Sequence, residues 1–350
     1  MGHIILTAIN AILPIILLIA LGYFLKRIRF LSGDFLKIGN KLVFRALLPV
    51  MLFMNIYDSN WSAFRWDIIL YALIAISVIF CLGLATCILT TKRADRRGVI
   101  LQCTFRSNFA IIGTSLAASL AGGSTTAGVT VALLQAFSIP MFNILAVISL
   151  SIFTDKPTEE EGVTAEKDEK HSVKGILLGI VKNPLIIGVV IGLIFLGLRS
   201  AEVAIFGDEV FTVKKHITFL YSALNQLKAV ASPFALIILG GQFEFSAVKG
   251  MYKEIIVGTA WRIVLAPLIG IGVAVLLSKY TSILPLGVNE YPALVALFAS
   301  PVAVSSAIMA SEMKGDEQLA TQLVVWTSVG SIITIFVIVC ILMSAGLLAV

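Results

Sequence analysis

The most constraining feature of this sequence is a series of apolar runs, each long enough to cross a membrane. The segments 4–25, 68–90 and 255–277 match the length of about 20 residues that a helix needs to cross the hydrocarbon layer. Over the whole chain 59% of residues are hydrophobic and 13% are charged, whereas a soluble domain averages about 25% charged residues. The sequence therefore predicts an all-α, polytopic membrane protein and argues against a soluble one.

Ten spans are expected, separated by short polar intervals. Their predicted bounds are 4–25, 36–57, 68–90, 99–121, 127–153, 175–198, 217–242, 252–277, 291–312 and 318–347. The interval 154–174 is the only long hydrophilic stretch, and its high charge and few large apolar residues predict a flexible linker. The chain would then consist of 1–153 with five spans, the linker 154–174, and 175–350 with five more.

The distribution of Lys and Arg between the spans predicts the orientation. If the N-terminus is outside, the inner loops contain fifteen Lys or Arg residues and the outer loops contain five. Because positive loops stay in the cytoplasm, both termini should be outside and the linker inside. An odd number of spans in each half places the second half upside down relative to the first, which predicts two inverted five-helix repeats.

A basic residue followed by a proline occurs at corresponding positions in the two halves, which supports the repeat. In the second span Arg45 precedes Pro49, and in the seventh span Lys228 precedes Pro233. The fourth and ninth spans are both interrupted by polar or helix-breaking residues. Paired interruptions at corresponding positions are typical of a transporter site near the middle of the membrane. We therefore expect the substrate site where these two broken helices meet.

The interruption of span 99–121 rests on Asn108, Gly113 and Thr114, because this span has no proline. If the helix unwinds there, free amides and a half-helix N-terminus would attract a carboxylate. The alternative is a continuous helix whose small residues pack closely against a neighbour. In span 291–312, Pro301 removes a backbone donor and breaks or kinks the helix. The predicted substrate-binding residues are Asn108, Gly113, Thr114, Ser300, Pro301, Val302, Ser305 and Ser306.

Other polar residues inside the spans are candidates for the cavity. Ionisable residues within a membrane span are by default hypotheses of function. Arg262 is the deepest basic candidate, and its alternative role is to bond carbonyl groups between helices or to reach an interface. The possible polar or cationic cavity residues are Asn10, Asn55, Gln135, Asn143 and Arg262. Asp and Glu occur only near span ends, which argues against a buried-carboxylate proton relay.

Several classes of function fit the sequence poorly. The three His residues lie at or outside the span ends, and the four Cys residues show no metal-ligand spacing. Gly122-Gly123 is not followed by Gly-Lys-Ser/Thr, so it is no phosphate-binding loop. The basic residues are scattered between apolar segments, which does not predict nucleic-acid binding. We expect no catalytic residues, metal or cofactor, and the coupling ion, Na+ or H+, stays open.

Three motifs and their order resemble the auxin efflux carrier family. They are the segments RSNFAIIG at 106–113, LPVMLF at 48–53 and SPVAVSS at 300–306. This family includes plant PIN-type carriers and bacterial carriers of malonate, malate and similar acids. Family members place Asn, often with proline, at the two helix breaks, and Asn108 and Pro301 match that pattern. The missing proline near Asn108, and Ser300 where plant carriers have Asn, put auxin itself in doubt as the substrate.

The resemblance implies a sodium–bile-acid-transporter-like arrangement with crossed broken helices. The first, second, sixth and seventh spans would form a scaffold that also offers a homodimer interface. The third to fifth and eighth to tenth spans would form a mobile transport domain. We expect a secondary, elevator-type carrier of a small carboxylate in the plasma (cell inner) membrane. The alternatives are a sodium-coupled symporter of a larger organic anion, and a membrane sensor or assembly subunit that transports nothing.

Overall fold

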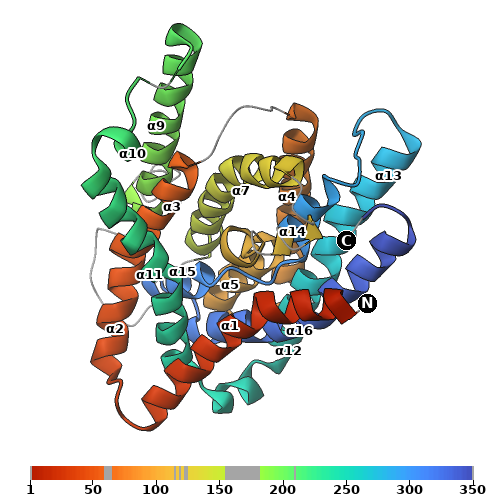
Figure 1. The fold of residues 1–350 in the computed structure, drawn as a ribbon. Helices are drawn as coiled ribbons and strands as arrows, with labels where there is room; N and C mark the ends of the chain where they lie inside the picture. The colour runs from red at the N-terminus through yellow and green to blue at the C-terminus, as the bar shows by residue number, and fades with distance from the viewer. Residues whose placement is uncertain are drawn as a thin grey trace, which may run out of the picture.

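The computed structural model describes residues 2–58, 65–113, 116–117, 120–121, 125–153, 182–208 and 210–348 (Figure 1). Within these ranges the protein is almost entirely helical, and strand pairing is limited to a single isolated backbone bridge. The described part of the chain has six helical segments that are long and apolar enough to cross a membrane: Trp66–Thr90, Leu133–Ser151, Pro184–Phe206, Thr218–Gln242, Tyr252–Tyr280 and Glu317–Ser344. The structure thus agrees with a polytopic helical membrane protein, while the ten spans and the inverted repeat stay predictions.

The N-terminal half follows the predicted order of spans. Its elements are α1 (Gly2–Arg27), α2 (Gly33–Leu42), η1 (Val43–Leu47), α3 (Leu48–Tyr57), α4 (Trp66–Thr90), α5 (Ala94–Phe105), η2 (Phe109–Gly113) and α7 (Thr125–Ser151). The predicted span 36–57 corresponds to α2, η1 and α3, where a π-helical turn replaces one stretch of α-helix. The predicted span 99–121 starts earlier, at Ala94, and is interrupted after Phe105.

Within the described residues, the C-terminal half contains more 3₁₀- and π-helical turns than the N-terminal half. Its elements are α9 (Pro184–Phe206), α10 (Val213–His216), α11 (Thr218–Gln242), η3 (Phe245–Gly250), α12 (Tyr252–Ala260), η4 (Trp261–Leu265), η5 (Leu268–Gly272), α13 (Val273–Tyr280), α14 (Tyr291–Ala299), α15 (Ser305–Glu312) and α16 (Glu317–Ser344). The predicted linker 154–174 and the first part of the predicted span 175–198 lie outside the described residues.

The helices pack in two groups. One group contains α1, α2, α3, α9 and α11, and the other contains α4, α5, α7 and α12 to α16. Small residues allow close backbone approach in the first group: a Cβ on Gly188 of α9 would lie 2.5 Å from the carbonyl oxygen of Pro49 in α3. The two groups meet along a boundary where α1 packs on α16, and α3 and α9 pack on α7.

Large apolar side chains cover the outer faces of the helices. On α4, for example, Leu70 and Ile74 are 53% and 61% exposed, and similar residues face outward from α1, α9 and α16. Contiguous exposed apolar surface of this extent is unfavourable in water but matches the acyl chains of a bilayer. The exposed faces therefore support the integral membrane location, whereas the orientation of the termini stays a prediction.

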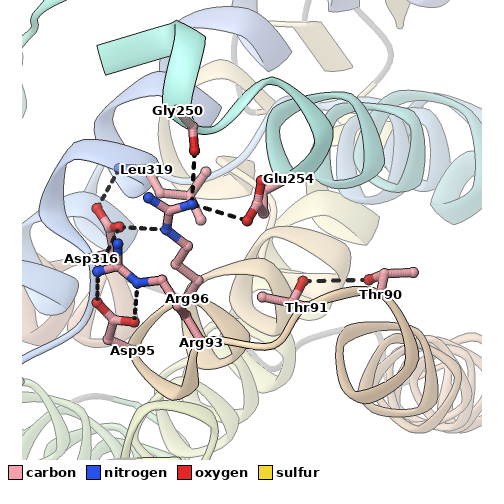
Figure 2. Close-up of polar contacts among 9 residues, drawn as sticks. All are labelled: Thr90, Thr91, Arg93, Asp95, Arg96, Gly250, Glu254, Asp316 and Leu319. Carbon is pink, nitrogen blue, oxygen red and sulfur yellow. Dashed lines mark hydrogen bonds and ion pairs between the residues drawn. The ribbon is translucent and has the colours of Figure 1, made fainter.

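A cluster of ion pairs fixes one end of the second group (Figure 2). Arg96, at the start of α5, forms two ion pairs. Its Nε lies 2.8 Å from Asp316 Oδ2, and its Nη1 lies 3.0 Å from Glu254 Oε1 of α12. Asp316 also accepts a hydrogen bond from the Leu319 amide at 2.9 Å and so caps the start of α16. Because one arginine joins three helices, the starts of α5, α12 and α16 are held together.

Candidate functional site

Two helix breaks from opposite halves of the chain lie side by side. Residues 106–108 separate α5 from η2, and residues 300–304 separate α14 from α15. The amide of Asn108 donates to the carbonyl oxygen of Pro301 at 2.7 Å, and the amide of Ala303 donates to that of Arg106 at 3.1 Å. Ser107 and Val302 form the antiparallel bridge between them. The two unwound segments therefore supply hydrogen-bond partners for each other's backbone groups, which non-helical backbone inside a membrane protein requires.

Local sequence explains the break after α14. Ser300 adopts extended backbone angles, which a residue before proline prefers, and Pro301 has no amide hydrogen to continue the helix. The Ser300 hydroxyl donates to the carbonyl oxygen of Ala296 at 2.6 Å, so the end of α14 has a partner for one of its free acceptors. The Ser-Pro pair thus favours the break, and the backbone bonds with residues 106–108 stabilise it, whereas the Ser232-Pro233 pair lies inside unbroken α11.

The break after α5 depends more on its neighbours. Without proline, the chain leaves the helix at Arg106, where the backbone becomes extended. Gly113, at the end of η2, sits against α14: a Cβ at this position would lie 2.9 Å from the carbonyl oxygen of Ala296 and 2.6 Å from the ring of Phe109. Only glycine therefore allows η2 to approach α14 this closely, which holds the two breaks together.

Arg262 connects the ends of the two helices that precede the breaks. Its guanidinium, only 1% exposed, donates to the carbonyl oxygen of Thr104 in α5 at 3.3 Å and to that of Phe298 in α14. A cation at a helix C-terminus is favourable because the last carbonyl groups carry partial negative charge. Arg262, predicted as a possible cavity residue, instead binds carbonyl groups behind the breaks and is not among the residues that line the cavity.

Arg106 lies on the opposite side of the breaks and has only neutral partners. Its Nη1 donates to Gln102 Oε1 at 2.9 Å and contacts Met309 Sδ, and its Nη2 donates to Asn143 Oδ1 at 2.8 Å. The residue is 3% exposed, and among the described residues no carboxylate is within ion-pair distance of it. A buried charge without an acidic partner is costly, and an ionisable residue within a membrane protein's apolar helices is by default a hypothesis of function.

A cavity lies in front of Arg106, on the boundary between the two helix groups. Its polar side consists of Arg106, Ser107, Asn108, Asn143 and Ser305. Its other side is largely apolar and comes from the first group: Leu48, Met51, Leu52, Leu185, Ser232 and Ala235. The volume is about 50 Å³, which is room for a few water molecules. Occupation by a larger molecule would require the two helix groups to move apart.

Two polar atoms of the cavity-lining residues have no hydrogen-bond partner: the Nδ2 of Asn108 and the hydroxyl of Ser107. Buried donors without a partner are uncommon and indicate a missing ligand or water. Together with Arg106 they provide donors for an anion. Helix α15 starts at Ser305, which also lines the cavity. The partial positive charge of this helix N-terminus would attract an anion, as the charge of Arg106 would.

The predicted site residues separate into three sets. Asn108, Ser305 and Asn143 line the cavity. The second set lies at or next to the breaks but does not line the cavity: Gly113, Ser300, Pro301, Val302, Ser306 and Gln135. The Val302 amide donates to Thr327 Oγ1 at 3.2 Å, and Gln135 Nε2 donates to the Phe109 carbonyl oxygen at 3.1 Å. The Ser306 hydroxyl has no hydrogen-bond partner. The third set is not brought to the cavity: Asn55 is half-buried in α3, and Thr114 and the side chain of Asn10 lie outside the described residues.

Sequence reasoning missed Arg106 as a cavity residue. The predicted span started at residue 99, which placed Arg106 near a helix end, whereas α5 starts at Ala94. Arg106 is therefore at the C-terminal end of α5, buried at the interruption. The signal that could have found it is the direct neighbourhood of Arg106, Ser107 and Asn108 at the interruption.

Comparison with protein families shows to which family this chain belongs. The profile of a family described as membrane transport protein matches residues 7–339, nearly the whole chain. The chain belongs to this membrane transport family. This family is the auxin efflux carrier family, which the motifs at the two breaks resemble. A comparison with curated proteins gives no significant match.

Membership of the membrane transport family gives the cavity a functional context. The family consists of transporters, so this chain is identified as a membrane transporter. The family match covers both helix breaks and both helix groups, so the geometry above belongs to the matched region. The substrate, the coupling ion and the oligomeric state do not follow from the family.

Proposed function

We propose that this protein is a secondary transporter of a small organic anion, with a compact carboxylate as the substrate class. The observation that carries the proposal is the buried guanidinium of Arg106, which faces the cavity and has only neutral hydrogen-bond partners. A carboxylate would supply the missing negative charge. Charge-assisted hydrogen bonds of this kind are about twice as strong as neutral ones.

The remaining donors complete the binding site. A carboxylate near Arg106 would also accept hydrogen bonds from the free Nδ2 of Asn108 and the hydroxyl of Ser107. Ser305 and the N-terminus of α15 add favourable electrostatics. A compact acid, such as malonate or malate, would need the helix groups to separate less than a bulky acid would. Auxin-like acids would need a larger opening between the helix groups.

The two helix groups supply the parts of an elevator mechanism. In this proposal α1 to α3, α9 and α11 form the scaffold, and α4, α5, α7 and α12 to α16 form the transport domain with crossed broken helices. The scaffold side of the cavity is mostly apolar, so the transport domain can slide past it without losing many hydrogen bonds. The bond from Asn40 Nδ2 to Glu312 Oε1 at 3.1 Å joins the two groups at one end and would have to break.

The first experiment measures binding of small carboxylates to the purified protein by thermal shift, with and without sodium. A ligand at 100 times its dissociation constant stabilises by about 2.7 kcal/mol, which is easily detected. The variant Arg106→Gln should lose the shift, whereas Arg106→Lys should retain part of it. The control Arg97→Gln removes an arginine that bonds the carbonyl of Thr91, outside the cavity lining, and should behave like the wild type.

Proteoliposome uptake with the same variants distinguishes the alternatives. A shift and uptake in both salts would support uniport or proton coupling. Dependence on sodium would instead favour the symporter of a larger anion. Binding without any uptake would favour a sensor, and retention of the full shift by Arg106→Gln would contradict the proposed site.

A further inference from the structure

A second pocket, with a different chemical character, lies at the end of α9 and α3. It has a volume of about 400 Å³ and is lined by Tyr57, Asp58, Arg199, Thr212, Lys214 and Lys215. None of these residues lines the cavity at the helix breaks. Figure 1 shows α10 at the edge of the molecule, beside the end of α3 and before the start of α11. The charge distribution of the loops predicts that this end faces the outside.

The short helix α10 holds the two lysines at the rim of this pocket. Thr212 precedes α10, and its Oγ1 accepts a hydrogen bond from the Lys215 amide at 3.1 Å. The Val213 amide donates to the hydroxyl of Tyr57 at 3.0 Å, which ties α10 to the end of α3. Arg199 lies 5.1 Å over the ring of Tyr57 and bonds its carbonyl oxygen. The backbone that carries Lys214 and Lys215 is therefore fixed beside Arg199, while the two lysine side chains are exposed.

The pocket carries an excess of positive charge. Its acidic member, Asp58, already accepts hydrogen bonds from Lys228 Nζ and from the Tyr221 hydroxyl, both at 3.0 Å. Among the described residues, no carboxylate is within ion-pair distance of Lys214 or Lys215. An anion that enters the pocket would meet these two lysines without having to displace an internal partner.

Exposed apolar residues lie in the chain on both sides of the lysines. Ile205 and Phe206 at the end of α9, and Phe219 at the start of α11, are 72%, 67% and 78% exposed. A segment that combines exposed large apolar side chains with neighbouring lysines is typical of the membrane interface, with the apolar groups among the acyl chains and the cations at the headgroups. A free anion would use only the pocket, whereas a phospholipid would use both features.

We propose that this pocket binds the headgroup of an anionic phospholipid. The phosphate would contact Arg199, Lys214 and Lys215, and the acyl chains would lie among the exposed apolar residues between 205 and 219. This site is separate from the transport site, so it does not depend on which substrate the protein carries.

The test compares the purified protein in nanodiscs of phosphatidylcholine with and without phosphatidylglycerol, and measures thermal stability and bound lipid by native mass spectrometry. The variant K214Q/K215Q should weaken phosphatidylglycerol binding roughly 30-fold, because each lysine near an anionic headgroup contributes about a fivefold change in affinity. The control K249Q/K253Q removes two exposed lysines from η3 and α12 and should bind like the wild type. K214R/K215R keeps the charge and should also bind.

Two results would overturn the proposal. One is equal phosphatidylglycerol binding by K214Q/K215Q and the wild type. The other is stabilisation of the wild-type protein by inorganic phosphate to the same extent as by phosphatidylglycerol, which would assign the pocket to a soluble anion. If K214Q/K215Q is poorly folded, the wild-type comparison of the two anions still decides between these outcomes.

Discussion

The amide of Asn108 donates to the carbonyl oxygen of Pro301 across 2.7 Å, and this bond joins the two halves of the protein at their helix breaks. The side chain of the same asparagine is left with a free Nδ2 that belongs to the lining of the cavity. One residue therefore uses its backbone to build the site and its side chain to offer a donor to a ligand. Substitution of the side chain can separate these two roles.

For Asn108→Ala we expect weaker carboxylate binding without loss of stability. The backbone bond to Pro301 remains, whereas the donor to the ligand is lost, and hydrogen bonds to charged groups contribute about 1.5–3 kcal/mol, or roughly 10- to 100-fold in affinity. Thermal-shift titration measures this change, with Asn55→Ala in α3 as the control. Unchanged binding and transport would remove Asn108 from the site.

Substitution of the two buried arginines should separate a structural role from a binding role. Arg262→Met leaves the carbonyl groups of Thr104 and Phe298 without a cation, so the melting temperature should fall. Arg106→Met should abolish acid binding. Its effect on stability should be smaller than the loss of a buried ion pair, because the removal of a buried charge without an acidic partner offsets the loss of donors to Gln102 and Asn143. Thermal unfolding of both variants with and without ligand measures the two effects, and acid binding by Arg106→Met equal to that of the wild type would contradict the proposed site.

Gly113→Ala should disturb the packing of the two breaks. The added methyl group would lie 2.9 Å from the Ala296 carbonyl oxygen, and overpacking of this kind costs about 1–3 kcal/mol. Gly197→Ala in α9 is the matched control, because a Cβ there meets no atom within 4 Å. In the control, helix propensity should leave stability unchanged or raise it by about 0.5–1 kcal/mol. Equal melting temperatures of the two variants would contradict the close approach of η2 to α14.

The ion-pair cluster of Figure 2 should depend strongly on Arg96 and weakly on Arg93. The side chain of Arg96 is 11% exposed and joins Glu254 and Asp316, whereas that of Arg93 is 57% exposed. Loss of one partner from a buried pair costs about 3–5 kcal/mol. Loss of an exposed pair costs about 0–1 kcal/mol. Chemical or thermal unfolding of Arg96→Gln and Arg93→Gln should therefore differ clearly, and similar values would show that the cluster is solvent-screened throughout.

Some features of the site were readable in the sequence because they depend on local chemistry. The Ser300-Pro301 pair marks a candidate break, since proline lacks an amide hydrogen and disfavours helical angles in the residue before it, although Ser232-Pro233 lies inside the continuous helix α11. The break at residues 106–108 has no such signal. It depends on a partner segment that accepts and donates its backbone hydrogen bonds, and that partner lies in the other half of the chain.

Hydropathy and polar interruptions, which are properties of short stretches of chain, were enough to determine a helical membrane protein and to identify Asn108 and Pro301 as candidates. Only the tertiary structure decided that Arg106 faces the cavity while Arg262 binds carbonyl groups behind it. Both are basic residues within apolar segments, so their sequence contexts look alike. Their roles differ because the balance of charge and hydrogen bonds around a buried guanidinium is set by residues distant in the sequence, which come together only when the helices pack.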